Sequence, residues 1–114
     1  MPKYHDQDPL DPVFQALADR SRRAMVERLA RGPASVTELA RPFDMALPSI
    51  VQHLAVLDAG GIVTSTKLGR VRTYQLVTDA LTPATDWMSR QRLPAERRFD
   101  RLADFLTGPH NKET

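Results

Sequence analysis

The strongest constraint on the fold is a change of residue pattern at Gly60-Gly61. Before these glycines apolar residues recur at helical spacing, whereas residues 62–66 and 71–77 after them are rich in β-branched side chains. Residues 67–70 between the two β-type segments include Gly69, which predicts a turn and therefore a β-hairpin. We expect a mainly α-helical chain with one hairpin, in the order of four helices, two strands and a last helix.

Local signals divide the first part of the helical region into three short helices. Apolar stripes indicate the first, around Val13, and the second, which ends before Gly32-Pro33. Ser35 and Glu38 have the spacing of a capping box, in which each side chain satisfies the other residue's free backbone amide. A third helix therefore begins there, and Pro42 limits its length.

The predicted fourth helix, residues 47–59, has one apolar face and one polar face. A helical wheel places Ile50, Leu54 and Leu57 together, on the side that turns toward a core. The opposite side is predicted to face solvent and carries Pro48, Ser49, Gln52 and Ala55. This helix therefore presents short polar side chains beside a buried stripe.

A last helical region is predicted from about residue 79 to residue 106, because apolar residues recur there at helical spacing. Pro94 removes a backbone hydrogen bond within it and is expected to kink or split the helix. With 114 residues, the chain is expected to form one domain over residues 8–107. Residues 1–7 and 108–114 are expected to be flexible tails.

The net charge of +2 conceals an uneven distribution along the chain. Residues 20–72 hold nine basic and four acidic side chains, a formal charge of +5, and the flanks together hold seven basic and ten acidic ones. Hydrophobic residues make up 41% and charged residues 26%, which is typical of a soluble globular protein. The local basic surface is therefore the feature that a function has to explain.

Composition also excludes several classes of site. The absence of cysteine rules out disulfides, thiolate metal sites and cysteine nucleophiles, and it is consistent with a reducing compartment. No apolar run is long enough to span a bilayer, and residues 1–8 lack the apolar stretch of a secretory signal. We therefore expect a cytoplasmic protein without a membrane partner.

Two short helices joined by a tight turn and followed at once by a basic hairpin are typical of a winged helix-turn-helix. A helix fits the major groove of B-DNA and presents polar side chains to base edges, while the hairpin, or wing, reaches the neighbouring backbone with Arg and Lys. Here Ser49 and Gln52 face outward, and Lys67, Arg70 and Arg72 lie on the wing. Such phosphate contacts contribute affinity and salt dependence without reading sequence.

Several strings of residues carry a more specific resemblance, which covers about residues 10–106. Together they resemble the ArsR family of bacterial transcriptional repressors, in a subgroup that generally lacks metal sites. The strings are Phe14-Gln15-Ala16-Leu17-Ala18-Asp19, Ser35-Val36-Thr37-Glu38-Leu39-Ala40, Pro42-Phe43-Asp44-Met45 and Gln52-His53-Leu54. The resemblance implies a homodimer, formed by the first and last helices, that binds a partly palindromic operator and occludes a promoter. It implies no cofactor.

Together, the outward-facing pattern and the resemblance assign residues to two surfaces. Base reading is assigned to Ser49 and Gln52, with Val51 as a further candidate. The full DNA-binding set is Thr37, Pro48, Ser49, Val51, Gln52, His53, Lys67, Arg70 and Arg72. The dimer interface is predicted at Val13, Phe14, Leu17, Leu81, Ala84, Trp87, Met88, Phe99, Leu102 and Leu106.

The chain departs from the family pattern in ways that bear on DNA reading. Ala46 replaces a Ser that commonly caps the recognition helix, at a cost of about 1 kcal/mol. Val51 and Ala55 stand where Ser and Lys are common. Val51 can pack on a thymine methyl group but cannot donate a hydrogen bond to a base. The operator sequences of relatives therefore cannot be transferred to this chain.

Alternative interpretations stay open at several positions. His53 is predicted to lie near DNA, and the alternative is a side chain packed at the helix edge. Arg22 and Arg23 are expected on a solvated helix face, with Arg23 paired to Glu27. An apolar stripe in the last helix is expected to be dimer core, and the alternative is a pocket for a small-molecule inducer.

The remaining functional alternatives concern the whole chain. An enzyme is not expected, because the sequence has no nucleophile elbow and no glycine-rich phosphate loop. The histidines lack metal-ligand spacing, so no metal site of the family's histidine or cysteine type is expected, and a site made of carboxylates stays the alternative. A repressor that responds to a ligand, a constitutive autorepressor and a winged-helix module that binds protein with weak or no DNA binding remain distinct possibilities.

Overall fold

The computed structural model describes residues 8–91 and 94–112, and the chain divides into two compact units. The first unit ends at Ala84 and the second begins at Thr85. A single folded domain over residues 8–107 stays a prediction from the sequence. Each unit is described by itself below.

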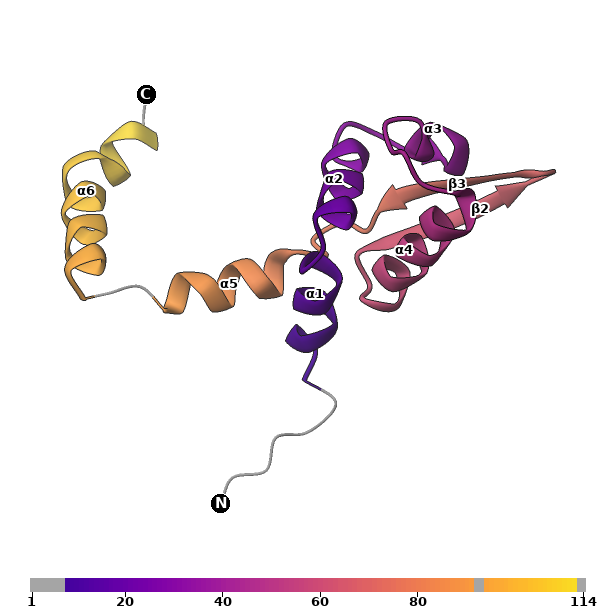
Figure 1. Ribbon diagram of the computed structural model, residues 1–114. Helices are drawn as coiled ribbons and strands as arrows, with labels where there is room; N and C mark the ends of the chain where they lie inside the picture. Colours follow the sequence, from indigo (N-terminus) through magenta and orange to yellow (C-terminus); the bar gives the residue numbers. More distant parts are fainter. Residues whose placement is uncertain (1–7, 92–93, 113–114) are drawn as a thin grey trace, which may run out of the picture. The chain divides into compact units, whose positions relative to one another are not determined.

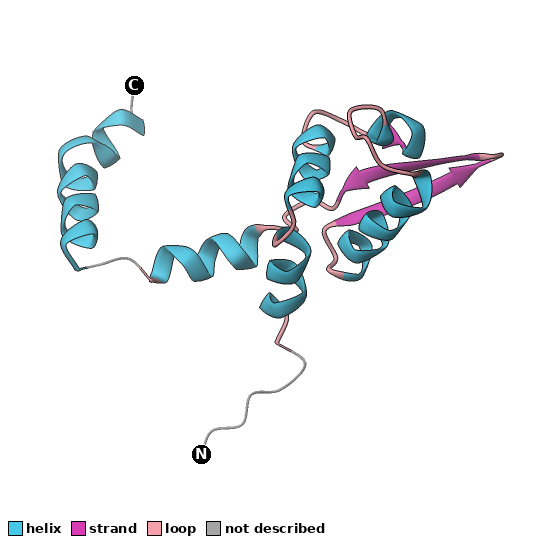
Figure 2. Ribbon diagram, in the orientation of Figure 1, coloured by secondary structure: helices cyan, strands magenta, loops and turns pink. Residues whose placement is uncertain are grey.

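The first unit contains the helix-turn-helix and the wing (Figures 1 and 2). It holds four helices, a very short strand and a hairpin, and α5 begins in it. The elements are α1 (Leu10–Leu17), α2 (Arg20–Leu29), β1 (Ala34–Ser35), α3 (Val36–Ala40), α4 (Leu47–Ala59), β2 (Val63–Leu68) and β3 (Val71–Leu76). The predicted winged-helix fold is confirmed, with one strand more than expected.

The three strands form an antiparallel sheet in the order β1-β3-β2. Ala34 of β1 is opposite Tyr74 of β3, and this pairing attaches the start of α3 to the base of the wing. Sequence patterns missed β1, because a strand of two residues has too little periodicity to detect. Its formation depends on a partner strand that is distant in sequence.

The wing turns more tightly than the sequence predicted. Leu68 and Val71 are still paired, so only Gly69 and Arg70 form the loop, where four residues were expected. Gly69 has a φ of +64°, and a two-residue hairpin loop favours glycine at such a position because its twist matches that of the strands. The tip of the hairpin extends beyond the helices of this unit (Figure 1).

A single apolar core holds the first unit together. The predicted apolar face of α4 is confirmed, because Ile50, Leu54 and Leu57 are completely buried. Met25 of α2 and Leu39 of α3 are equally inaccessible and belong to the same cluster. The core therefore fixes one side of α4 and leaves its other side exposed.

Caps and a close glycine contact define the helix boundaries. The predicted capping box is present: the Glu38 amide donates to Ser35 Oγ at 3.2 Å, and the Ser35 amide donates to Glu38 Oε1 at 2.8 Å. At the end of α4, a Cβ on Gly60 would lie 3.0 Å from the carbonyl oxygen of Pro12. Glycine thus permits the close approach of α1 to α4.

The predicted last helix is two helices, α5 (Thr82–Arg90) and α6 (Pro94–Lys112). Pro94 is the first residue of α6, a position that tolerates proline because the first helical amide has no partner in the helix. The predicted split at Pro94 is therefore confirmed. The helix continues to Lys112, well into the predicted C-terminal tail, while the predicted N-terminal tail lies outside the described residues.

Candidate nucleic-acid interface

The exposed face of α4 carries the residues predicted to read bases. Pro48, Ser49, Val51 and Gln52 are all exposed, on the side opposite the buried stripe. Ala55 follows them one turn later and is exposed as well. The face is thus a shallow surface of small and neutral side chains.

The start of α4 lacks a side-chain cap, as the sequence predicted. Ala46 occupies the N-cap position, and its carbonyl oxygen accepts from the amides of Ser49 at 3.0 Å and Ile50 at 3.3 Å. Because Pro48 has no amide proton, the start of α4 has one free backbone donor fewer than a helix without proline in its first turn.

The wing gathers its cations near its tip. Lys67 and Arg72 are opposite each other in the β2–β3 register, so their side chains lie on the same face of the hairpin. Arg72 Nη1 donates to Ser65 Oγ at 2.8 Å, which orients its guanidinium group along the strand. Arg70 is exposed in the turn itself. Like charges placed opposite each other repel, and an anion bound between them would relieve that repulsion.

An exposed threonine on α3 and an exposed leucine at the wing tip also belong to this surface. Thr37 is the second residue of α3 and is exposed, as a phosphate contact requires. Leu68, next to the turn, is 83% exposed and is opposite the exposed Val71. The sequence prediction missed this apolar tip, although a leucine beside a turn glycine was the available signal.

His53 does not project freely toward solvent. It is half-buried, and its Nδ1 accepts a hydrogen bond from Arg22 Nη1 at 3.1 Å. An accepting Nδ1 places the proton of a neutral imidazole on Nε2, an assignment that follows from the hydrogen-bond network. Packing at the helix edge, the alternative to direct DNA proximity, accounts for this geometry, and DNA contact by His53 stays a prediction.

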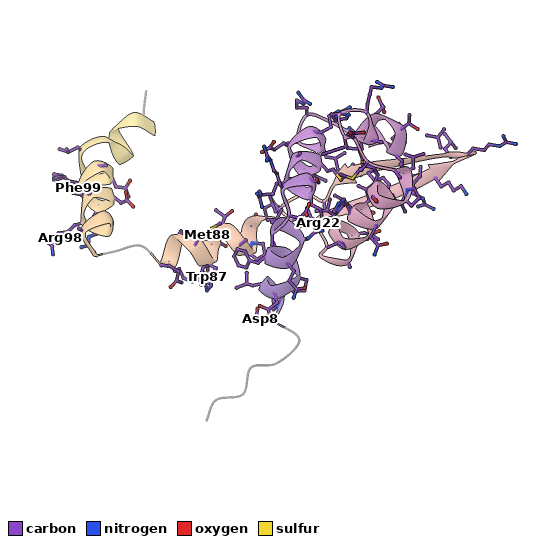
Figure 3. All side chains as sticks on the ribbon, in the orientation of Figure 1. Asp8, Arg22, Trp87, Met88, Arg98 and Phe99 are labelled. Carbon is purple, nitrogen blue, oxygen red and sulfur yellow. The ribbon has the colours of Figure 1, made fainter. Side chains whose placement is uncertain are left out.

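Arg22 connects three helices, which corrects its predicted place on a solvated face. Its Nε donates to the carbonyl oxygen of Ala16 at 2.7 Å, and its Nη2 donates to that of Gln15 at 3.0 Å. These carbonyls lie in the last turn of α1, and the Gln15 oxygen also accepts from the Ala18 amide at 3.2 Å. Arg22 lies on α2 (Figure 3), and its Nη1 reaches Nδ1 of His53 on α4. Arg23 donates to the carbonyl oxygen of Leu17 at 2.7 Å, not to Glu27 as predicted.

Asp19 supports this connection from the start of α2. The Arg22 amide donates to Asp19 Oδ2 at 3.0 Å, and this bond is the main cause that holds the pKa of Asp19 below its ordinary value. His53 Nδ1 lies 3.9 Å from the same oxygen. The carboxylate thus caps α2 beside the Arg22–His53 hydrogen bond.

The predicted dimer residues fall into three groups. Val13 and Ala84 are 6% and 2% exposed in the core of the first unit, and their place in a dimer interface stays a prediction. Phe14, Leu17 and Leu81 are partly buried against that core. The exposed ones are Trp87, Met88, Phe99, Leu102 and Leu106.

The exposed apolar residues belong to α5 and α6. Trp87 and Met88 project from different sides of α5, and Phe99 projects from α6 (Figure 3). Phe105, which the sequence prediction omitted, is 77% exposed on α6. Each helix thus presents large apolar side chains that are at least 41% exposed.

Residues 8–91 and 94–112 contain neither a metal cluster nor a helix that could span a membrane. No group of three or more histidine or acidic side chains is placed there to hold a metal ion. None of the helices in those ranges combines the length and apolarity that crossing a bilayer requires.

Comparisons with known proteins agree with the geometry. A family model described as a helix-turn-helix domain matches residues 17–66. The HTH-type transcriptional regulator Rv2034 of Mycobacterium tuberculosis is 50% identical over 66 residues, 58% of this chain and 62% of that protein. The transcriptional repressor SdpR of Bacillus subtilis is 29% identical over 79 residues, 69% of this chain and 88% of that protein.

A solved structure extends the likeness over more of the chain. The crystal structure of an ArsR family transcriptional regulator has a TM-score of 0.71 and 46% sequence identity, and the match covers 80% of this chain and 92% of that one. The match to Rv2034 spans less than two thirds of that protein, while the crystallised regulator is matched over almost its whole length. The similar proteins are named as transcriptional regulators or repressors. The chain belongs to the ArsR family of transcriptional regulators.

Proposed function

We propose that the chain is a homodimeric repressor that binds operator DNA and blocks a promoter. The exposed face of α4 enters the major groove, and the wing contacts the adjacent backbone. The observation that carries this proposal is the pairing of Lys67 with Arg72 on one face of a projecting hairpin beside an α4 face free of the core. Phosphate is the anion that such a pair of cations would receive on DNA.

Roles within the interface follow from the side chains. Gln52 and Ser49 are the hydrogen-bonding groups on the exposed face of α4, so they read base edges, and Val51 packs on thymine methyl groups. Lys67, Arg70 and Arg72 contact phosphate or the minor groove, and Thr37 contacts phosphate from α3. His53 acts by fixing α4 through Arg22, and its direct contact with the backbone is a secondary proposal.

Dimerisation is proposed through the exposed apolar side chains of α5 and α6. Trp87, Met88, Phe99, Leu102 and Phe105 expose large apolar surfaces whose burial would be favourable by about 25 cal/mol per Å². Twofold symmetry then presents two α4 helices to half-sites about one helical turn apart. A symmetric operator is the direct consequence.

The test is a nuclease footprint on DNA from upstream of the chain's own gene. The proposal predicts a protected, twofold symmetric site, lost in a Gln52→Ala, Ser49→Ala variant that keeps its fold and its dimeric state. A dimer of undiminished stability that protects no DNA would instead favour the alternative of a protein-interaction module. Candidate inducers are then added to the footprint, because release of the site separates a ligand-responsive repressor from a constitutive one.

A further inference from the structure

An open cleft of about 520 Å³ lies between α2, α3 and the turn that follows α3. Its floor is apolar, because Ala24, Pro42 and Phe43 present accessible surface there above the buried Met25 and Leu39. Its rim carries three guanidinium groups and one carboxylate, those of Arg28, Arg31, Arg41 and Glu38. All of these residues belong to the first unit, and none was assigned a function from the sequence.

Among the described residues, two of the four charged side chains of the rim form hydrogen bonds to other residues, and two do not. Glu38 accepts from the Ser35 amide, which is the main cause of its lowered pKa, with smaller contributions from the charges of Arg28 and Arg41. Arg28 Nη1 donates to the carbonyl oxygen of Gly32 at 3.0 Å. The side chains of Arg31 and Arg41 are exposed, and no hydrogen bond or ion pair joins them to other residues in the described ranges. The cleft therefore has a net charge of +2 and two guanidinium groups available to a ligand.

The combination of floor and rim selects a class of ligand. Small-molecule sites are typically lined by apolar side chains with a few polar groups that fix the orientation, in volumes of about 300–1,000 Å³. Guanidinium groups pair bidentately with carboxylates. We propose that this cleft binds a small organic acid, with a carboxylate held by Arg31 and Arg41 and an aromatic or aliphatic body on the floor.

The principal competing ligand is the phosphate backbone of DNA. A phosphate satisfies the cations but brings no apolar group to cover the accessible surfaces of Ala24, Pro42 and Phe43. The small acid uses both halves of the cleft, so the observations favour it. Binding is predicted for the free protein and does not depend on the proposed DNA binding, although α2 and α3 both pack against α4.

The probe is 4-phenylbutyrate, titrated into the full chain while amide proton and nitrogen shifts are followed by NMR. Two further probes separate its parts: 4-phenylbutanol has the same body without the charge, and acetate has the charge without the body. The proposal predicts saturable shifts at residues that line the cleft, such as Ala24, Leu39 and Phe43, with 4-phenylbutyrate binding more tightly than either control.

Two variants with the same loss of charge sharpen the test. Arg31→Gln with Arg41→Gln is expected to weaken 4-phenylbutyrate binding about tenfold, the loss of two partly solvated charge-assisted contacts. Arg70→Gln with Arg72→Gln changes the wing and is expected to leave binding unchanged. Ala24→Leu, which fills the floor and keeps every arginine, is expected to weaken binding of the phenyl compounds.

Several results would overturn the proposal. Shifts confined to α6, equal affinity for 4-phenylbutanol, or no saturable binding at millimolar concentrations each contradict a small-acid site in the cleft. Equal weakening by the two double variants would indicate a general effect of charge. Loss of DNA affinity in the Arg31→Gln, Arg41→Gln variant without any effect on 4-phenylbutyrate would identify DNA phosphate as the ligand.

Discussion

Replacement of Arg22 by methionine is predicted to weaken the first unit and to loosen α4. Methionine keeps an unbranched apolar stem but removes the donors to Ala16, Gln15 and His53. Two of the three bonds are part-buried and one is exposed. At about 1–1.5 kcal/mol for each part-buried bond and about 0.5 kcal/mol for the exposed one, the expected loss is about 3 kcal/mol. The α1 carbonyls would be left without these partners.

Arg23→Met is the matched control, because Arg23 lies next to Arg22 on α2 and makes one exposed bond to Leu17. Its expected cost is about 0.5 kcal/mol. Free energies of unfolding are measured by urea denaturation followed by circular dichroism, at one protein concentration because dimerisation would shift the apparent stability. Equal losses in Arg22→Met and Arg23→Met would refute the assigned role of Arg22.

A double-mutant cycle isolates the bond between α2 and α4. Arg22→Met and His53→Leu are measured singly and together, and a coupling free energy of about 0.5–1.5 kcal/mol is expected, because the two side chains share one hydrogen bond. The same variants are then assayed for operator affinity at a concentration of urea where all remain folded. Zero coupling would mean that the bond does not stabilise the position of α4.

The remaining predictions concern caps, a close contact and acid stability. Ala46→Ser adds an N-cap to α4 and is expected to raise the free energy of unfolding by about 1 kcal/mol in urea denaturation. Gly60→Ala forces a Cβ to 3.0 Å from the Pro12 carbonyl oxygen and is expected to cost about 1–3 kcal/mol, whereas an unchanged midpoint would contradict that contact. Because the folded pKa of Asp19 is depressed, its stabilisation is complete above the unfolded pKa of about 3.9 and is lost as pH falls through the folded value. Asp19→Asn, which retains capping ability, should therefore flatten the dependence of stability on pH below about 5. An unaltered slope of unfolding free energy against pH would argue against stabilisation by the Asp19 carboxylate.

Local patterns predicted the parts of the fold that local forces determine. The capping box at Ser35 and Glu38, the buried stripe of α4 and the break at Pro94 all depend on residues within one or two helical turns of each other. The strand β1 could not be found this way, because Ala34 becomes part of a strand only by pairing with Tyr74.

In the candidate site, too, local patterns predicted some residues and missed others that depend on contacts distant in sequence. The exposed positions on α4 and the wing follow from helical and strand periodicity, and the structure places them as expected. Periodicity does not predict the hydrogen bonds of Arg22, because residues 15, 16 and 53 approach this side chain only in the folded chain. The helical spacing of Arg23 and Glu27 suggested a surface ion pair, whereas carbonyl oxygens in the last turn of α1 accept from Arg22 and Arg23.

The salt dependence of operator binding tests most directly the proposal that α4 and the wing form the DNA interface. Affinity is measured by fluorescence anisotropy from low to physiological salt for the unaltered chain and for two variants of equal charge. Arg70→Gln with Arg72→Gln removes four wing cations from a dimer and is expected to reduce the slope of log K against log salt by about 3 to 4, since each phosphate contact contributes about 0.9. Arg31→Gln with Arg41→Gln is expected to leave the slope unchanged. A slope that both variants reduce equally, or that neither reduces, would contradict the assignment of the wing to DNA.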